Sequence, residues 1–166
     1  HTNTTGTENT GVGSSAMYAN TTGASNSALG YAALYTNSTG DQNTAFGHSA
    51  LADNGTADNN TAFGYFALRL NTTGTGVTAV GKDSLTANTT GNYNTAFGRS
   101  SLHANTTGYS NTAIGLNALY SNTTGNFNVA LGQSTLEANT ANSNTAIGHE
   151  TLIANTSAAN NTGVGY

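Results

Sequence analysis

Hydrophobic and polar positions recur every 17 residues along the whole chain. The repeating unit reads N-T-A-φ-G-x-x-A-L-x-x-N-T-T-G-x-x, where φ is a large apolar residue, and residues 94–108 are a clear copy of it. The glycine after φ marks ten copies, with one residue missing near 141–142: Gly13, Gly30, Gly47, Gly64, Gly81, Gly98, Gly115, Gly132, Gly148 and Gly165. A fixed period of this size indicates stacked coils. We therefore predict one repeat domain, residues 1–166, that forms an all-β parallel β-solenoid or β-roll of ten 17-residue coils.

Residue types predict the elements within each coil. T-A-φ is short, β-favouring and bounded by Asn and Gly, which is typical of a strand. N-T-T-G is typical of a turn, with Gly at positive φ. The x-x-A-L-x-x segment is compatible with a second short strand or a helical turn. We expect the φ and Leu columns to form the core, so that aspartate at Phe97 or Leu102 unfolds the neighbouring coils, with stacked Asn and Thr ladders and a small Ala column completing it.

Composition narrows the function. Only 6% of residues are charged, the net charge is −4, and the three cations are Arg69, Lys82 and Arg99, so we expect no nucleic-acid partner. No apolar run approaches the roughly 20 residues of a membrane span, so we expect no membrane insertion. We also expect no cofactor. The apolar core is thin and the chain begins in mid-repeat, which favours an oligomeric segment of a longer fibre, with its end coils covered by flanking sequence or a neighbouring chain.

Four segments carry a family resemblance: Asn43–Gly47, Asn94–Gly98, Asn111–Gly115 and Asn144–Gly148, reading N-T-A-F-G or N-T-A-I-G. They resemble the head repeats of YadA-like trimeric autotransporter adhesins, and the longer unit with A-L-x-x-N-T-T-G resembles repeats of phage tail fibres and large bacterial surface proteins. The resemblance implies a β-roll, commonly a homotrimer, located at the cell surface or on a virion, with a role in attachment. The coil is longer than that of the adhesin heads, and no stalk or anchor is present in the sequence.

Two variable columns are candidates for glycan binding. One directly follows the φ-Gly step and the other lies four residues further on, with small residues between them. Aromatic and basic side chains suit sugars because flat rings stack on sugar faces and polar edges hydrogen-bond. The candidate residues are Tyr18, Tyr31, Tyr35, His48, Tyr65, Arg99, His103 and Tyr120.

Asn-X-Ser/Thr recurs in the predicted turns, where glycan acceptors would be exposed; the alternative is that the motif is only turn chemistry. The candidate glycosylation sites are Asn20, Asn37, Asn71, Asn88, Asn105 and Asn122.

Other chemistry is less well supported. Asp41 and Asp58 lie 17 residues apart, hence about 5 Å apart in one column, a separation compatible with a retaining glycosidase. Nothing apolar near them would separate their pKa values. The histidines are dispersed over different coils, so we predict neither catalytic residues nor a metal site. The leading hypothesis is a structural fibre or adhesin segment that associates as a homotrimer or an end-to-end filament and displays a surface for attachment, possible ligands being glycans. The alternatives are an ice-binding solenoid or a polysaccharide depolymerase.

Overall fold

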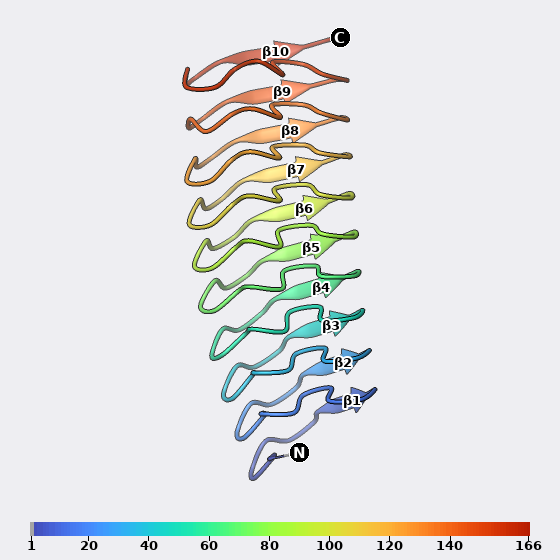
Figure 1. The fold of residues 1–166 in the computed structure, drawn as a ribbon. Coiled ribbons are helices and arrows are strands. Elements are labelled where there is room, and N and C mark those ends of the chain that lie inside the picture. Colours follow the sequence, from blue (N-terminus) through green and yellow to red (C-terminus); the bar gives the residue numbers. More distant parts are fainter. Residues whose placement is uncertain (1) are drawn as a thin grey trace.

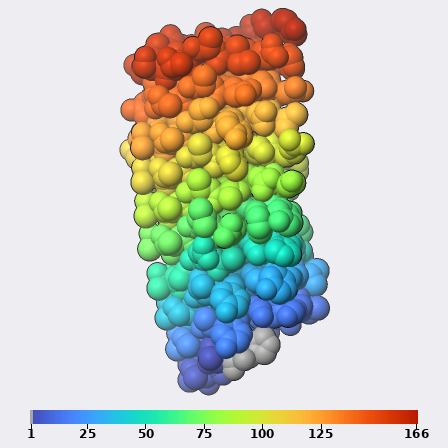
Figure 2. All heavy atoms as spheres, in the orientation of Figure 1, coloured from blue at the N-terminus to red at the C-terminus, as the bar shows by residue number. Residues whose placement is uncertain are grey.

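The computed structural model describes residues 2–166 and stacks them as a rod, in which each coil occupies its own layer (Figures 1 and 2). Each coil contributes one three-residue strand: β1 Thr10–Val12, β2 Ser27–Leu29, β3 Thr44–Phe46, β4 Thr61–Phe63, β5 Thr78–Val80, β6 Thr95–Phe97, β7 Thr112–Ile114, β8 Val129–Leu131, β9 Thr145–Ile147 and β10 Thr162–Val164. The ten strands form one parallel sheet in chain order, and each copy of T-A-φ lies opposite the next copy. The prediction of an all-β parallel solenoid is confirmed.

The alternation of side chains along each strand decides which residue enters the core. Only the middle residue of T-A-φ faces inward, since successive strand residues point to opposite faces. Ala96 is fully buried, whereas Phe97 is 55% exposed. The prediction that the φ column lies in the core is therefore wrong. The core consists of the strand Ala column packed against the Ala-Leu pairs from the opposite side of the coil.

The x-x-A-L-x-x segment is neither a second strand nor a helix. Ala33 and Leu34 are adjacent and both are fully buried, which an extended strand does not allow. Leu34 has a φ of 53°, in the left-handed region, and this turn directs its side chain inward beside that of Ala33. The backbone still pairs with the neighbouring coils, because Leu34 N–H donates to Ala50 O at 3.0 Å and Ala32 N–H donates to Ser14 O at 2.9 Å. The same left-handed conformation recurs down the Leu column, at Leu51, Leu68, Leu85, Leu102, Leu119, Leu136 and Leu152.

Two columns of buried asparagine form the polar half of the core. In the turn-asparagine column, the first Asn of each N-T-T-G, Asn37 Nδ2 donates to Asn20 Oδ1 and to Gly40 O, both at 2.9 Å. In the strand-asparagine column, the Asn before T-A-φ, Asn26 Nδ2 donates to the same Gly40 O at 2.8 Å, and Asn26 Oδ1 accepts Asn43 N–H at 2.9 Å. These ladders were predicted. In the two ladders the buried asparagine side chains have hydrogen-bond partners, as buried polar groups in a stable interior require.

The turn chemistry differs from the prediction. The glycine of N-T-T-G, such as Gly91, is not at positive φ; the left-handed residue lies two positions later, where Tyr93 has a φ of 57°. Gly91 is instead closely packed, because an added Cβ would clash with the carbonyl oxygen of Gly108 on the next coil and would lie 2.6 Å from Asn88 Oδ1. The turn therefore favours glycine for its small size and not for its φ.

The missing residue near 141–142 falls in a turn, so the sheet register is kept: Val129 still pairs with Thr145. The turn-asparagine column is interrupted there. Asn139 Nδ2 donates to Ala141 O at 2.9 Å but not to the preceding coil, and Asn122 Oδ1 is buried without a hydrogen-bond partner. The ladder resumes with Asn155 Nδ2 donating to Asn139 Oδ1.

Restoring the missing residue should stabilise the rod. Inserting Thr after Thr140 and replacing Ala141 with Gly recreates N-T-T-G, so that Asn139 can donate to Asn122 Oδ1. We expect the free energy of unfolding to rise by about 1–2 kcal/mol, since an unsatisfied buried acceptor costs roughly that much. Urea unfolding with an unchanged slope measures it. The control is a Thr inserted after Thr106, in an intact turn, which should destabilise; a repaired chain that is less stable than the parent would contradict the assignment.

Candidate functional site

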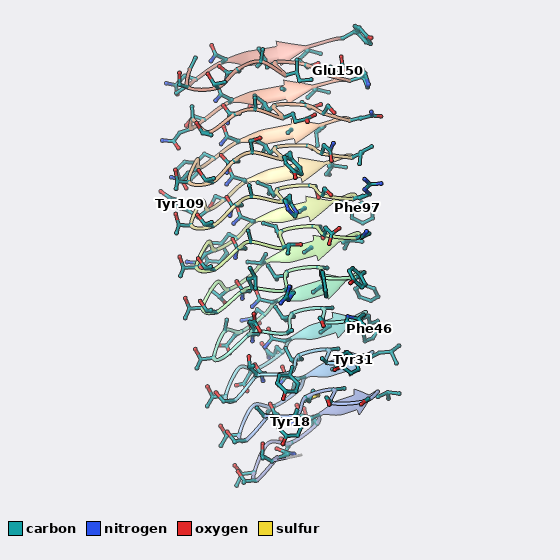
Figure 3. All side chains as sticks on the ribbon, viewed as in Figure 1. Tyr18, Tyr31, Phe46, Phe97, Tyr109 and Glu150 are labelled. Carbon is teal, nitrogen blue, oxygen red and sulfur yellow. The ribbon has the colours of Figure 1, made fainter. Side chains whose placement is uncertain are left out.

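The first candidate surface is the outer face of the sheet, formed by the outward Thr and φ columns and here called the sheet face. Among residues 2–166, the strand threonine hydroxyls, such as those of Thr44, Thr61 and Thr95, make no side-chain hydrogen bond within the chain. The φ residues beside them form a continuous apolar row, in which the rings of Phe46 and Phe63 meet edge to face with centroids 4.6 Å apart. Figure 3 shows Phe46 and Phe97 along one edge of the rod and Tyr109 along the other. The sheet face is thus an apolar row flanked by free hydroxyls.

The second candidate surface contains the two variable columns predicted from the sequence and is here called the aromatic strip. The structure stacks their rings along the rod axis. Tyr18 lies on Tyr35 with centroids 5.2 Å apart and planes 10° apart. Tyr31 and Tyr65 lie on opposite faces of His48, at 4.9 and 5.2 Å.

His103 and Tyr120 form a further stacked pair in the strip, with centroids 5.1 Å apart.

Stacking changes what the aromatic strip offers to a ligand. Each ring covers one face of its neighbour, and His48 is covered on both faces, so part of the ring surface predicted to stack on sugars is occupied within each ladder. The hydroxyl groups and ring edges stay available, and Tyr31 and Tyr65 are 56% and 45% exposed. A ligand that lies along this surface therefore meets mainly hydrogen-bonding edges.

A third column runs between the two variable columns and forms the floor of the aromatic strip. Most of it is small, and Ser49, Ser100 and Ser134 are nearly buried. Phe66 interrupts this column. The centroid of its ring lies 4.0 Å from that of Tyr65 and 5.7 Å from that of His48. Arg69 Cζ lies 4.8 Å from the same Phe66 centroid. Phe66 thus connects the two variable columns.

Three residues of this surface, Phe66, Arg69 and Lys82, were not among the candidates from sequence. Lys82 Nζ lies 5.7 Å from the centroid of the Tyr65 ring, and Arg69 lies over Phe66. Arg69 and Lys82 occupy the same variable columns as the candidates, so column membership alone could have found them. Phe66 lies in the small-residue column and had no such signal.

The six candidate glycosylation sites are not exposed. Asn20 is 1% exposed, and Asn37, Asn71, Asn88, Asn105 and Asn122 are fully buried. The Nδ2 atom that would carry a glycan instead donates within the ladder, as Asn105 Nδ2 does to Asn88 Oδ1 at 2.8 Å. The expectation of exposed acceptors is wrong, because the turn directs these side chains into the core.

The acidic pair has a structural role in the backbone ladder. Asp58 Oδ1 accepts Asp41 N–H at 2.8 Å, and Asp41 Oδ1 accepts Ala24 N–H at 2.7 Å. The same bond recurs with asparagine, as when Asn92 Oδ1 accepts Thr75 N–H at 2.9 Å. Each carboxylate therefore satisfies an amide of the preceding coil, which explains the 17-residue spacing without catalysis.

Residues 2–166 contain no group of three or more His, Asp or Glu close enough to hold a metal ion. His149 Nε2 lies 3.8 Å from Oε1 of the adjacent Glu150, and the His149 ring stacks on that of Tyr166. The same residues include no helix of a length and hydropathy that would cross a bilayer.

No protein family model matches this chain, and no curated protein or solved structure is significantly similar to it.

Proposed function

We propose that this chain is a rod segment of a homo-oligomeric fibre, displayed on a cell surface or a virion, which carries a repetitive surface used for attachment. The observation that supports it is the apolar row of the sheet face. Seven of the ten φ residues are exposed: Val12, Leu29, Phe63, Phe97, Ile114, Ile147 and Val164. A soluble monomer seldom exposes an apolar patch of this length, and such patches mark interaction sites.

The energy available from this row is of the size that association needs. Completing the burial of a half-exposed Leu or Phe side chain contributes about 1 kcal/mol, or on the order of 10 kcal/mol for the row. Association of two proteins costs roughly 4–15 kcal/mol in lost freedom and ordering. The row can therefore hold copies together over its full length, whereas a few coils could not.

Other copies of the same chain are the occupants we infer for the sheet face. A copy aligned in parallel presents the same row at the same coil spacing, so apolar side chains meet at every layer. The free hydroxyls of the Thr column border the row and can hydrogen-bond across the junction or to water. Three copies around a common axis is the arrangement that the resemblance to the adhesin heads implies.

Substitutions on the sheet face should release the copies without unfolding them. We expect the parent to sediment as an oligomer, with three chains as the predicted number, and the Phe63→Ser/Phe97→Ser double variant to sediment as a monomer. Two large apolar contacts per chain are lost, while the Ala-Leu core is untouched. Sedimentation equilibrium gives the mass, and far-UV circular dichroism checks the fold.

The matched control is Tyr93→Ser/Phe127→Ser, which removes two exposed rings, 64% and 55% exposed, from the turn side of the rod. It should keep the parent's mass. A parent that is monomeric at 100 μM (about tenfold above a 10 μM Kd) would overturn the proposal.

Ice binding is the second candidate, favoured by one observation. The Thr column that could order water lies on the strands, with neighbours about 4.8 Å apart, and not in the N-T-T-G turns. Against it, the neighbouring φ column varies from Val to Phe, so the face is uneven. A thermal hysteresis that disappears in Thr78→Leu/Thr95→Leu would favour ice binding over the fibre.

A further inference from the structure

All the lysine and arginine residues of this acidic chain lie on three consecutive coils. Lys82 and Arg99 occupy equivalent positions of neighbouring coils, whose backbones are paired through Ser100 N–H donating to Lys82 O at 3.0 Å. Arg69 lies one coil earlier in the other column of the aromatic strip. We call Arg69, Lys82 and Arg99 the basic cluster.

The positive charges of the basic cluster are poorly compensated within residues 2–166. Lys82 Nζ lies 3.7 Å from Asp83 Oδ2, with 60% of the lysine side chain exposed, and no carboxylate lies within 4.0 Å of Arg69 or Arg99. Tyr65 precedes Lys82 in the column and Leu116 follows Arg99, and both are neutral. Like charges at neighbouring positions of adjacent coils repel each other, as they do on adjacent strands. An anion placed between the two side chains would remove that repulsion.

The rest of the column indicates what carries the anion. Tyr31, His48 and Tyr65 continue it toward the N-terminus, with their faces stacked on one another. Both tyrosines are exposed, whereas His48 Nδ1 lies 3.1 Å from Ser49 Oγ. Tyrosine hydroxyls donate to and accept from sugar hydroxyls, and arginine and lysine bind carboxylates. Single-stranded nucleic acid needs free ring faces for base stacking, whereas here both faces of His48 are covered and Tyr65 lies between His48 and Lys82 Nζ.

We propose that the column Tyr31–His48–Tyr65–Lys82–Arg99, with Arg69 beside it, binds a linear acidic polysaccharide of the polyuronate class, laid along the rod axis. Carboxylates contact the basic cluster, and the hydroxyl groups of the sugar rings contact the tyrosine edges. This inference rests on the attachment role proposed above and gives it a ligand class. It does not depend on oligomerisation, because every named residue belongs to one chain.

The test compares polygalacturonate with dextran of similar length by isothermal titration calorimetry at 50 mM and 300 mM NaCl. We expect binding of polygalacturonate that weakens with salt, and none of dextran. Lys82→Gln/Arg99→Gln should weaken binding at least tenfold at low salt. Lys82→Arg should bind like the parent, because it keeps the charge. Both substituted side chains are exposed, so the melting temperature should not fall.

Three results would overturn the proposal: equal affinity of the double variant and the parent, equal binding of dextran, or tighter binding of single-stranded DNA than of polygalacturonate. Tyr18→Ser/Tyr35→Ser is the matched control, since it removes a stacked pair two coils away from the basic cluster and should leave the affinity unchanged. The mass of the oligomer, measured in parallel, distinguishes the two proposals. An intact oligomer that does not bind polygalacturonate would reject only the proposed ligand. A monomer that binds polygalacturonate would reject only the proposed fibre.

Discussion

Leu102→Asp is expected to unfold the coils around β6, with a loss of more than about 5 kcal/mol in the free energy of unfolding. Leu102 is fully buried against the strand Ala column. The substitution removes the largest apolar contact of its coil and places an unpaired carboxylate among alanine and leucine side chains. Because each coil contacts only its neighbours, we expect the damage to divide the rod. Limited proteolysis should then cleave near residue 102, and circular dichroism should show a lower melting temperature.

Phe97→Asp is the matched control, five residues away in the same coil. Its side chain is 55% exposed on the sheet face, so the aspartate stays hydrated. The sequence alone predicted that each of the two substitutions unfolds the neighbouring coils, and the structure reverses that expectation for Phe97. We expect a shift in stability below about 1 kcal/mol, together with weaker association of the copies. If Phe97→Asp unfolds the chain and Leu102→Asp does not, the inward and outward columns have been exchanged.

Gly98→Val should be nearly as damaging, for a backbone reason. Gly98 has a φ of 138°, and a Cβ there would lie 2.5 Å from Gly115 O on the next coil. A β-branched residue is strained at this φ and pushes the two coils apart, so their ladder hydrogen bonds break. We expect a loss of more than about 3 kcal/mol, measured by urea unfolding.

Gly55→Ala provides the comparison for this substitution. Gly55 is not at positive φ, and an added Cβ would lie 3.9 Å from its nearest contact, Thr72 O. The change should be neutral, or slightly stabilising because alanine restricts the unfolded chain. If Gly98→Val and Gly55→Ala lowered the free energy of unfolding by similar amounts, glycine at position 98 would not be required for coil stacking.

The sequence predicted which residues of the candidate site line up along the rod, but not which of their atoms face a ligand. The period alone places Tyr31, His48 and Tyr65 in one line, and the structure keeps them there. Whether their faces or edges meet a ligand depends on ring rotation, which the sequence does not specify. The acceptor motif at Asn105 was visible in the sequence, yet only the direction of its side chain shows that the amide lies in the core.

The sequence by itself determined how the coils repeat along the rod: the 17-residue period, one T-A-φ strand per coil, the parallel register and the stacking of asparagine on asparagine. Identical residues at a fixed interval must lie in columns, because any other register would lose every ladder contact at once. Tertiary structure decided which columns face inward. That choice depends on backbone dihedral angles, and above all on the left-handed conformation of Leu34 and its equivalents, a conformation that leucine does not favour. The coil closes only with those turns, so packing imposes a conformation that no local preference predicts, and it turns the φ column outward to form the sheet face.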